Sequence, residues 1–198
     1  MSVPWLATAV VGIAILFASI AGARAPTIPR WEQRAFRAVN RLPGSLYWVL
    51  WLPMQLGNLV VGTAAGLAVA LVAGETVATI GVVLAMVMKL VIERVLRRLL
   101  AGHIPARQRP GTSQPDAIRR GGDVPESGTS FPSGHVVLAA AVSCVVAPVL
   151  PAGWEIAPFV LTALVMFGRV YVGAHNPLDV TAGLGAGLFV GALVAALG

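Results

Sequence analysis

A polar stretch, GRVYVGAHNPLD at residues 168–179, lies where two long apolar runs meet near the end of the chain. Within it, Arg169 stands six residues before His175, and Asp179 follows four residues after that histidine. Ionisable side chains are costly in a bilayer, so those retained beside membrane spans are functional by default. The stretch therefore indicates a membrane protein with a chemically active site where two spans end.

The composition agrees with a chain that crosses a membrane several times. The 198 residues are 57% hydrophobic and 11% charged, with a mean hydropathy of +0.83, whereas a soluble domain carries about 25% charged residues. About 20 apolar residues form one helical span, and such runs occur at roughly 4–22, 46–73, 76–96, 136–150, 156–172 and 178–197. We expect an all-α, polytopic bundle of six transmembrane helices that forms one domain over residues 1–198.

The segment between the first two runs has the pattern of an interfacial amphipathic helix. Arginines recur at helical spacing, at positions 30, 34, 37 and 41. An apolar stripe lies beside them, formed by Trp31, Ala35, Ala38 and Leu42. A helix of this kind lies on the lipid headgroups and keeps its cationic groups in water.

All 14 Lys and Arg residues fall on one face of the expected bundle, and the formal net charge is +6. They flank the spans, so membrane lipids with anionic or phosphorylated headgroups are the expected partners, and nucleic acid is not. Glycines recur four residues apart, at 62 and 66 and at 183, 187 and 191, which permits close helix packing. We assign them to packing within the bundle, although a homodimer would give the same pattern.

A second candidate motif is Pro132-Ser133-Gly134-His135, which stands just before an apolar helical run. The N-terminus of a helix presents unpaired N–H groups and a positive dipole end, which suit phosphate oxygens. Ser133 adds a hydroxyl donor, and His135 is able to deliver a proton nearby.

The spacing of His175 and Asp179 indicates a second histidine site. Asn176-Pro177 is a helix-start signal, so Asp179 lies about one helical turn from His175. A carboxylate that binds one imidazole nitrogen fixes the tautomer and leaves the other nitrogen as a nucleophile. The planar guanidinium of Arg169 is suited to grip a phosphate.

Together, these motifs resemble the type 2 phosphatidic acid phosphatase superfamily of membrane lipid phosphatases. The family motifs are Lys-x6-Arg-Pro, Pro-Ser-Gly-His and Ser-Arg-x5-His-x3-Asp. The second is unchanged at 132–135, and the third has Gly168 in place of its first serine. The resemblance also covers the six-span plan and the order of the motifs.

The first motif departs from the family pattern. Arg109-Pro110 supplies its Arg-Pro pair, but Gly102 occupies the place of the lysine. Lys89 lies twenty residues before Arg109 and shares a helical face with Glu93. We favour Lys89 with Arg109 as the cationic pair. The alternatives are that Arg97 or Arg98 replaces the lysine, and that Lys89 only forms a salt bridge with Glu93. His103 belongs to no motif and is expected in a loop or at the interface.

The resemblance implies a lipid phosphatase that works through a phosphohistidine and needs no metal or cofactor. His175 would attack phosphorus, Asp179 would orient it, and His135 would protonate the leaving oxygen and then activate water. The phosphate would be held by Arg169, Ser133, Gly134, Arg109 and Lys89. The carboxylates are scattered along the chain, which gives no cluster for magnesium. Positioning and charge neutralisation are the main needs of phosphoryl transfer.

Two alternatives remain at this stage, a transporter and a non-catalytic protein built on the same bundle. A transporter would carry charges near the middle of several spans, whereas these charges lie at span ends. The resemblance implies that the substrate is a phosphomonoester or diphosphate of a lipid, of the phosphatidic acid, phosphatidylglycerol phosphate or polyprenyl type. We expect a multi-pass protein of the cell membrane. The positive-inside rule places the charged face in the cytoplasm, while the resemblance places it outside, so the orientation stays open.

Overall fold

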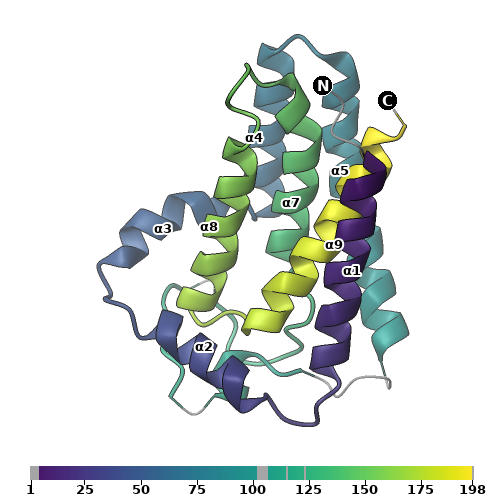
Figure 1. The fold of residues 1–198 in the computed structure, drawn as a ribbon. Helices are drawn as coiled ribbons and strands as arrows, with labels where there is room; N and C mark the ends of the chain where they lie inside the picture. Colours follow the sequence, from purple (N-terminus) through teal and green to yellow (C-terminus); the bar gives the residue numbers. More distant parts are fainter. Residues whose placement is uncertain (1–4, 102–106, 115, 123, 198) are drawn as a thin grey trace.

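The computed structural model describes residues 5–101, 107–114, 116–122 and 124–197, so the expected position of His103 lies outside the described residues. The all-α prediction is confirmed for this described part of the chain, which forms a helical bundle (Figure 1). The helices are α1 (Trp5–Ala23), α2 (Arg30–Asn40), α3 (Leu46–Gln55), α4 (Leu59–Val72), α5 (Thr76–Leu100), α6 (Pro110–Ser113), α7 (Gly134–Val146), the 3₁₀ turn η1 (Ala147–Val149), α8 (Ala157–Tyr171) and α9 (Pro177–Ala195).

Helix α7 forms the centre of the bundle. It packs against α4, α5, α8 and α9, while α1 lies along the outer side of α9 (Figure 1). Almost every side chain from Val136 to Val146 is buried, as expected for a helix that is apolar on all sides. Helix α2 lies across the lower end in Figure 1, next to α8 and α9.

Glycines allow the long helices to approach each other closely. A Cβ atom at Gly12 of α1 would lie 2.8 Å from the carbonyl oxygen of Gly185 in α9. A Cβ atom at Gly187 would lie 2.6 Å from the Cβ atom of Ala140 in α7, and one at Gly191 would lie 2.5 Å from that of Cys144. The predicted glycine stripe of α9 therefore packs inside the bundle, against α7.

The apolar run at 46–73, expected to form one span, does not form a single straight helix. The chain there forms α3 and α4, which are bent by 67° relative to each other. Pro53 removes a helical hydrogen bond near the end of α3. Asn58 then starts a new helix, because its side-chain oxygen accepts hydrogen bonds from the N–H groups of Val60 and Val61 at 3.0 and 3.3 Å. Helix α3 packs beside α8, and only α4 continues alongside α7.

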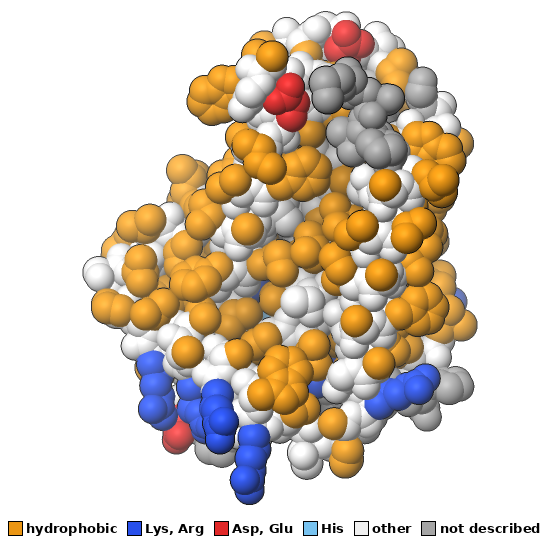
Figure 2. All heavy atoms as spheres, viewed as in Figure 1, with side chains coloured by type: hydrophobic (Ala, Val, Ile, Leu, Met, Phe, Trp, Pro, Cys, Tyr) orange, Lys and Arg blue, Asp and Glu red, His pale blue; other side chains and the backbone are white. Residues whose placement is uncertain are grey.

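Three of the described helices, α1, α5 and α9, are long and apolar enough to cross a membrane singly. The bent pair α3–α4 raises this number to four, and α7 with η1 and α8 are shorter apolar helices. Apolar side chains cover much of the visible face between the two ends, and Lys and Arg gather at the end near α2 (Figure 2). Helix α1 begins and α9 ends at the opposite end (Figure 1).

The helix predicted between the first two runs forms as α2. Trp31 and Ala35, which belong to its expected apolar stripe, are exposed on the protein surface. A different face is buried against the bundle, through Glu32, Phe36 and Asn40. These buried side chains fix α2 to the charged end of the protein.

We predict that Gly12→Val destabilises the bundle. The new side chain meets backbone atoms of α9 that cannot move aside cheaply, and overpacking of this kind costs about 1–3 kcal/mol. Thermal unfolding in detergent measures the effect. The matched control is Ala14→Val, which places the same valine side chain at an exposed position of α1. Equal melting temperatures for the two variants would contradict the close approach of α1 and α9.

Candidate active site

The charged end of the bundle contains a pocket of about 350 Å³. Six of the eight site residues expected from the sequence line it, namely Lys89, Arg109, Gly134, His135, Arg169 and His175. The other described residues in its wall are Gly57, Asn58, Leu59, Glu93, Arg97 and Pro125. Four cationic side chains and one carboxylate thus surround the pocket, which favours an anionic ligand.

The turn between α8 and α9 places His175 over the end of α8, next to Arg169. Its residue Gly173 has a φ of +77°, a left-handed conformation that glycine adopts at little cost. The N–H groups of Ala174 and His175 both donate to the carbonyl oxygen of Arg169, at 3.0 and 3.2 Å. This folded backbone explains why the fixed spacing between Arg169 and His175 brings them to one pocket.

Asp179 lies in the first turn of α9, fully buried behind His175. Its Oδ2 atom accepts a hydrogen bond from the N–H of Asn176 at 2.8 Å, which caps the helix. The same Oδ2 lies 3.9 Å from Nδ1 of His175. This distance is longer than a hydrogen bond, so the carboxylate faces the imidazole across a short gap.

Arg107 holds the other oxygen of Asp179. Its Nε donates to Oδ1 at 3.0 Å, and its Nη2 donates to Oε1 of Glu32 in α2 at 2.5 Å. All three side chains are buried, and the same Oε1 of Glu32 accepts a hydrogen bond from the N–H of Leu178 at 2.9 Å. This cluster of Arg107, Glu32 and Asp179 joins α2, the loop after α5 and the start of α9.

His135 lies in the first turn of α7, as the Pro-Ser-Gly-His motif predicts. The N–H of Ser133 donates to the carbonyl oxygen of Asp179 at 2.9 Å, so the starts of α7 and α9 are adjacent. Ser133 itself is fully buried and lies outside the pocket wall. A Cβ atom at Gly57 would lie 2.7 Å from that of His135, so the break between α3 and α4 packs directly on this histidine.

Two of the three side chains considered for the place of the first-motif lysine line the pocket. Lys89 and Arg97 lie on either side of Glu93 on α5, with Lys89 Nζ 2.8 Å from one carboxylate oxygen and Arg97 Nη2 2.5 Å from the other. Both cationic side chains line the pocket, while Arg98 lies outside it. The expected salt bridge of Lys89 with Glu93 is therefore compatible with a place in the site.

Arg109 enters from the loop after α5, and its Nη1 donates to the carbonyl oxygen of Ala174 at 3.0 Å. This bond joins the loop to the turn that carries His175. The loop is ordered here, because Arg109 N–H donates to the carbonyl oxygen of Gly128, and Ser130 N–H donates to that of Arg107. In the described part of this loop, Gln108 and Thr129 form an isolated antiparallel bridge, and the short helix α6 follows Arg109.

Burial and positive charge set the protonation of the site. Burial, followed by the charges of Arg169 and Arg109, holds the pKa of His175 well below its usual range. Burial and the charge of Arg97 also lower the pKa of Arg109. These surroundings favour the neutral form of the His175 imidazole, and the crowded cationic side chains favour a ligand that brings negative charge.

The sequence reasoning missed the residues behind the pocket. Arg107 stands two residues before Arg109, and Glu32 is the one acidic residue within the arginine-rich segment of α2. Gln114 was also missed; its side chain donates to Oδ1 of Asn176 at 3.0 Å. An acidic residue among regularly spaced arginines was the available signal for Glu32, and no local pattern distinguished Arg107 from its neighbours.

Comparisons with known proteins identify relatives of the chain. Residues 64–197 match the family model described as the PAP2 superfamily. The crystal structure of LpxE from Aquifex aeolicus is 21% identical, with a TM-score of 0.69, over 81% of this chain and 92% of that chain. The first transmembrane PAP2 type phosphatidylglycerolphosphate phosphatase from Bacillus subtilis is 25% identical, with a TM-score of 0.68, over 94% of this chain and 95% of that chain. No curated protein shows a significant match.

We predict that Arg107→Ala strongly destabilises the protein. It leaves the carboxylates of Glu32 and Asp179 buried without their cation, and breaking a buried pair in this way costs about 3–5 kcal/mol. Unfolding in detergent measures the loss. The control is Arg41→Ala, which removes an exposed ion pair with Asp116 and should cost less than about 1 kcal/mol. Similar losses in both variants would argue against a structural role for the cluster.

Proposed function

The chain belongs to the PAP2 superfamily, and we propose that it is an integral membrane phosphatase that hydrolyses a lipid phosphate through a phosphohistidine. The single observation that carries this proposal is the convergence of His135 and His175 with four cationic side chains in one pocket. A transporter would need charged groups along a path through the bundle, whereas these groups line one pocket, and the Lys and Arg side chains visible in Figure 2 gather mainly at one end.

The first step would transfer the phosphoryl group to His175. Its Nδ1 faces Asp179, so Nε2 is the nitrogen that attacks phosphorus while the bond to the lipid oxygen breaks. His135 would take up a proton once the negative charge of the bound phosphate offsets the nearby cations, and would give it to that oxygen as the lipid leaves. The charge that develops on the imidazole is stabilised by the nearby carboxylate of Asp179, which Arg107 holds in place.

The second step would release phosphate. His135, now neutral, accepts a proton from a water molecule whose oxygen attacks the phosphohistidine. The P–N bond then breaks, and His175 returns to its neutral form. His135 thus serves as the acid in the first step and as the base in the second, which explains why two histidines are sufficient in the pocket.

The phosphoryl oxygens would be held by Arg169, Arg109, Lys89 and the N–H of Gly134 at the start of α7. We add Arg97 to this set, because it lines the same wall. Ser133 was expected to contact phosphate, but its place behind the wall supports a role in positioning the start of α7. We propose that these cationic side chains neutralise the transferred group without a metal or cofactor.

In the membrane, we propose six spans, formed by α1, α4, α5, α7, α8 and α9, within a single domain of residues 1–198. Helix α2 would lie on the headgroups, with Trp31 and Ala35 toward the lipid and its buried face on the protein. The pocket would then open at the level of the lipid phosphates of the cell membrane. The relative from Bacillus subtilis acts on phosphatidylglycerolphosphate by its name, and a phosphomonoester or diphosphate lipid is the substrate class we propose here.

We predict that His175→Ala abolishes phosphate release from lipid phosphates in detergent, with EDTA present throughout. The same variant should form no acid-labile phosphohistidine when it is incubated with radiolabelled substrate.

His135→Ala separates the role of His135 as an acid in the first step from its role as a base in the second step. An aryl phosphate is used for this purpose, because its leaving group needs little protonation. With that substrate, His135→Ala should still phosphorylate His175 and should accumulate the intermediate, since water lacks its base.

Two results would contradict these assignments. Full activity in His175→Ala would exclude it as the nucleophile, and loss of wild-type activity with EDTA would exclude a metal-free reaction. Gln55→Ala is a suitable control, because within the described residues the Gln55 side chain donates its hydrogen bond to the carbonyl oxygen of Trp51, in the same helix α3.

We predict that activity persists into acid. A nucleophilic imidazole must be neutral, and burial lowers the pKa of His175 from its usual value of about 6.5. The acid limb of kcat/KM should therefore lie below pH 6.5, because kcat/KM reports groups of the free enzyme. Phosphorus NMR of the substrate without enzyme measures the pKa of the substrate phosphate, so that ionisation of the substrate can be distinguished from that of the enzyme. An enzyme limb at or above pH 6.5 would mean that His175 is not the buried nucleophile.

A further inference from the structure

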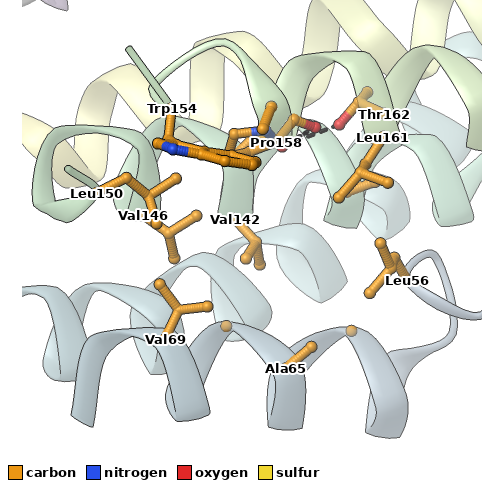
Figure 3. A pocket seen from close by; sticks show the side chains of 15 residues that line it. Leu56, Ala65, Val69, Val142, Val146, Leu150, Trp154, Pro158, Leu161 and Thr162 are labelled. Atoms are coloured by element: carbon orange, nitrogen blue, oxygen red, sulfur yellow. Dashed lines mark hydrogen bonds between the residues drawn. The ribbon is translucent and has the colours of Figure 1, made fainter. Parts of the chain in front are cut away.

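An apolar groove of about 260 Å³ runs along one side of α7, between α4 and α8. Figure 3 shows its lining side chains, with Val142 and Val146 facing Val69 and Ala65 across the space. Leu56 lies at one end, and Leu150 and Trp154 lie at the other. The groove is on the part of the bundle that we assign to the membrane.

The two hydroxyl groups in the wall of the groove bind each other. The hydroxyl groups of Ser143 and Thr162 are 2.9 Å apart, and the Ser143 hydroxyl donates to the carbonyl oxygen of Pro158 at 2.9 Å. Figure 3 shows Pro158 and Thr162 near each other at the edge of the space. A ligand in the groove therefore meets an apolar surface and needs no hydrogen-bonding groups of its own.

The groove begins where the phosphate pocket ends. Leu56 lines the groove, and the next three residues, Gly57 to Leu59, line the phosphate pocket. On α7, Ala139 of the groove lies one turn from His135 of the pocket. Both cavities therefore adjoin the break between α3 and α4, and their linings on α7 are one helical turn apart.

We propose that the groove binds one hydrocarbon chain of the lipid whose phosphate occupies the pocket. This inference rests on the proposed function and adds a second binding site to it. The site selects substrates by the length of a hydrocarbon chain, which Trp154 and Leu150 limit at the far end.

The dimensions favour a single chain. The helical rise from His135 to Val146 is roughly 16 Å at about 1.5 Å per residue. This length is about half of the roughly 30 Å hydrocarbon core of a bilayer, so it matches the depth to which a lipid chain extends from its headgroup.

A helix of a second copy of this chain is the alternative occupant. One turn of such a helix, about 10–12 Å wide, would fill roughly 400–600 Å³, which exceeds the groove volume of about 260 Å³. A second copy of this chain is therefore a poorer fit.

The first test blocks the groove with a bulky side chain placed on α4. Ala65→Phe places a ring in the space, and Ala64→Phe adds the same ring one residue away, at an exposed position. Each protein is assayed in nanodiscs with dipalmitoyl phosphatidic acid and with the soluble ester p-nitrophenyl phosphate. The ratio of kcat/KM for the two substrates should fall about tenfold in Ala65→Phe and should stay at the wild-type value in Ala64→Phe. An unchanged ratio in both variants would overturn the proposal.

A binding measurement tests the groove independently of turnover. Phosphatidic acid with a diazirine in one palmitoyl chain is photolysed with the His175→Ala protein, and the labelled peptides are mapped by mass spectrometry. Label should fall on residues 139–162 and should be lost when Ala65→Phe is added. Label confined to other faces of the protein would contradict binding of the hydrocarbon chain in the groove. If the wild type hydrolyses neither ester while this labelling occurs, the proposed function fails and the chain-binding site stands.

Discussion

The carboxylate of Asp179 is the constraint on which the charged end of this protein depends. A buried carboxylate must be paired and hydrogen-bonded, or it is a large cost to the fold. Here one oxygen accepts from Arg107 and the other from the N–H of Asn176, and the backbone carbonyl accepts from Ser133. Each of these partners comes from a different segment, so the carboxylate of Asp179 fixes the loop after α5 and the turn before α9, and its backbone carbonyl fixes the start of α7. Glu32 extends the same arrangement to α2 through Arg107.

The rest of the bundle is held by a different kind of interaction. Lipid tails are as apolar as the side chains of the helices, so association within a bilayer depends on close van der Waals packing. The glycines of α1 and α9 supply that closeness, with backbone atoms of Gly12 and Gly185 in near contact. Hydrogen bonds and ion pairs at the charged end therefore position the candidate site. Close packing of small residues along the spans holds together the bundle that carries this site in the membrane.

The sequence was informative where a physical rule acts locally. Long apolar runs predicted the helices, and the spacing of Arg169, His175 and Asp179 predicted a cluster, because turn and helix geometry convert that spacing into proximity. The break at 56–58 was not predicted, since Pro53 and Gly57 are compatible with a membrane helix that only kinks. Arg107 and Glu32 were missed because 75 residues separate them, and no local pattern indicates a pairing over such a distance.

The break between α3 and α4 also gives the pocket its relation to the groove. A straight helix over 46–73 would present one continuous face to α7 and α8. Because α3 turns away at Leu56, Gly57 can approach His135 while Asn58 starts α4 beside the pocket. The same turn leaves Leu56 at the mouth of the groove. A single departure from the regular span thus brings a charged cavity and an apolar cavity together, which is the arrangement that an amphipathic lipid phosphate requires.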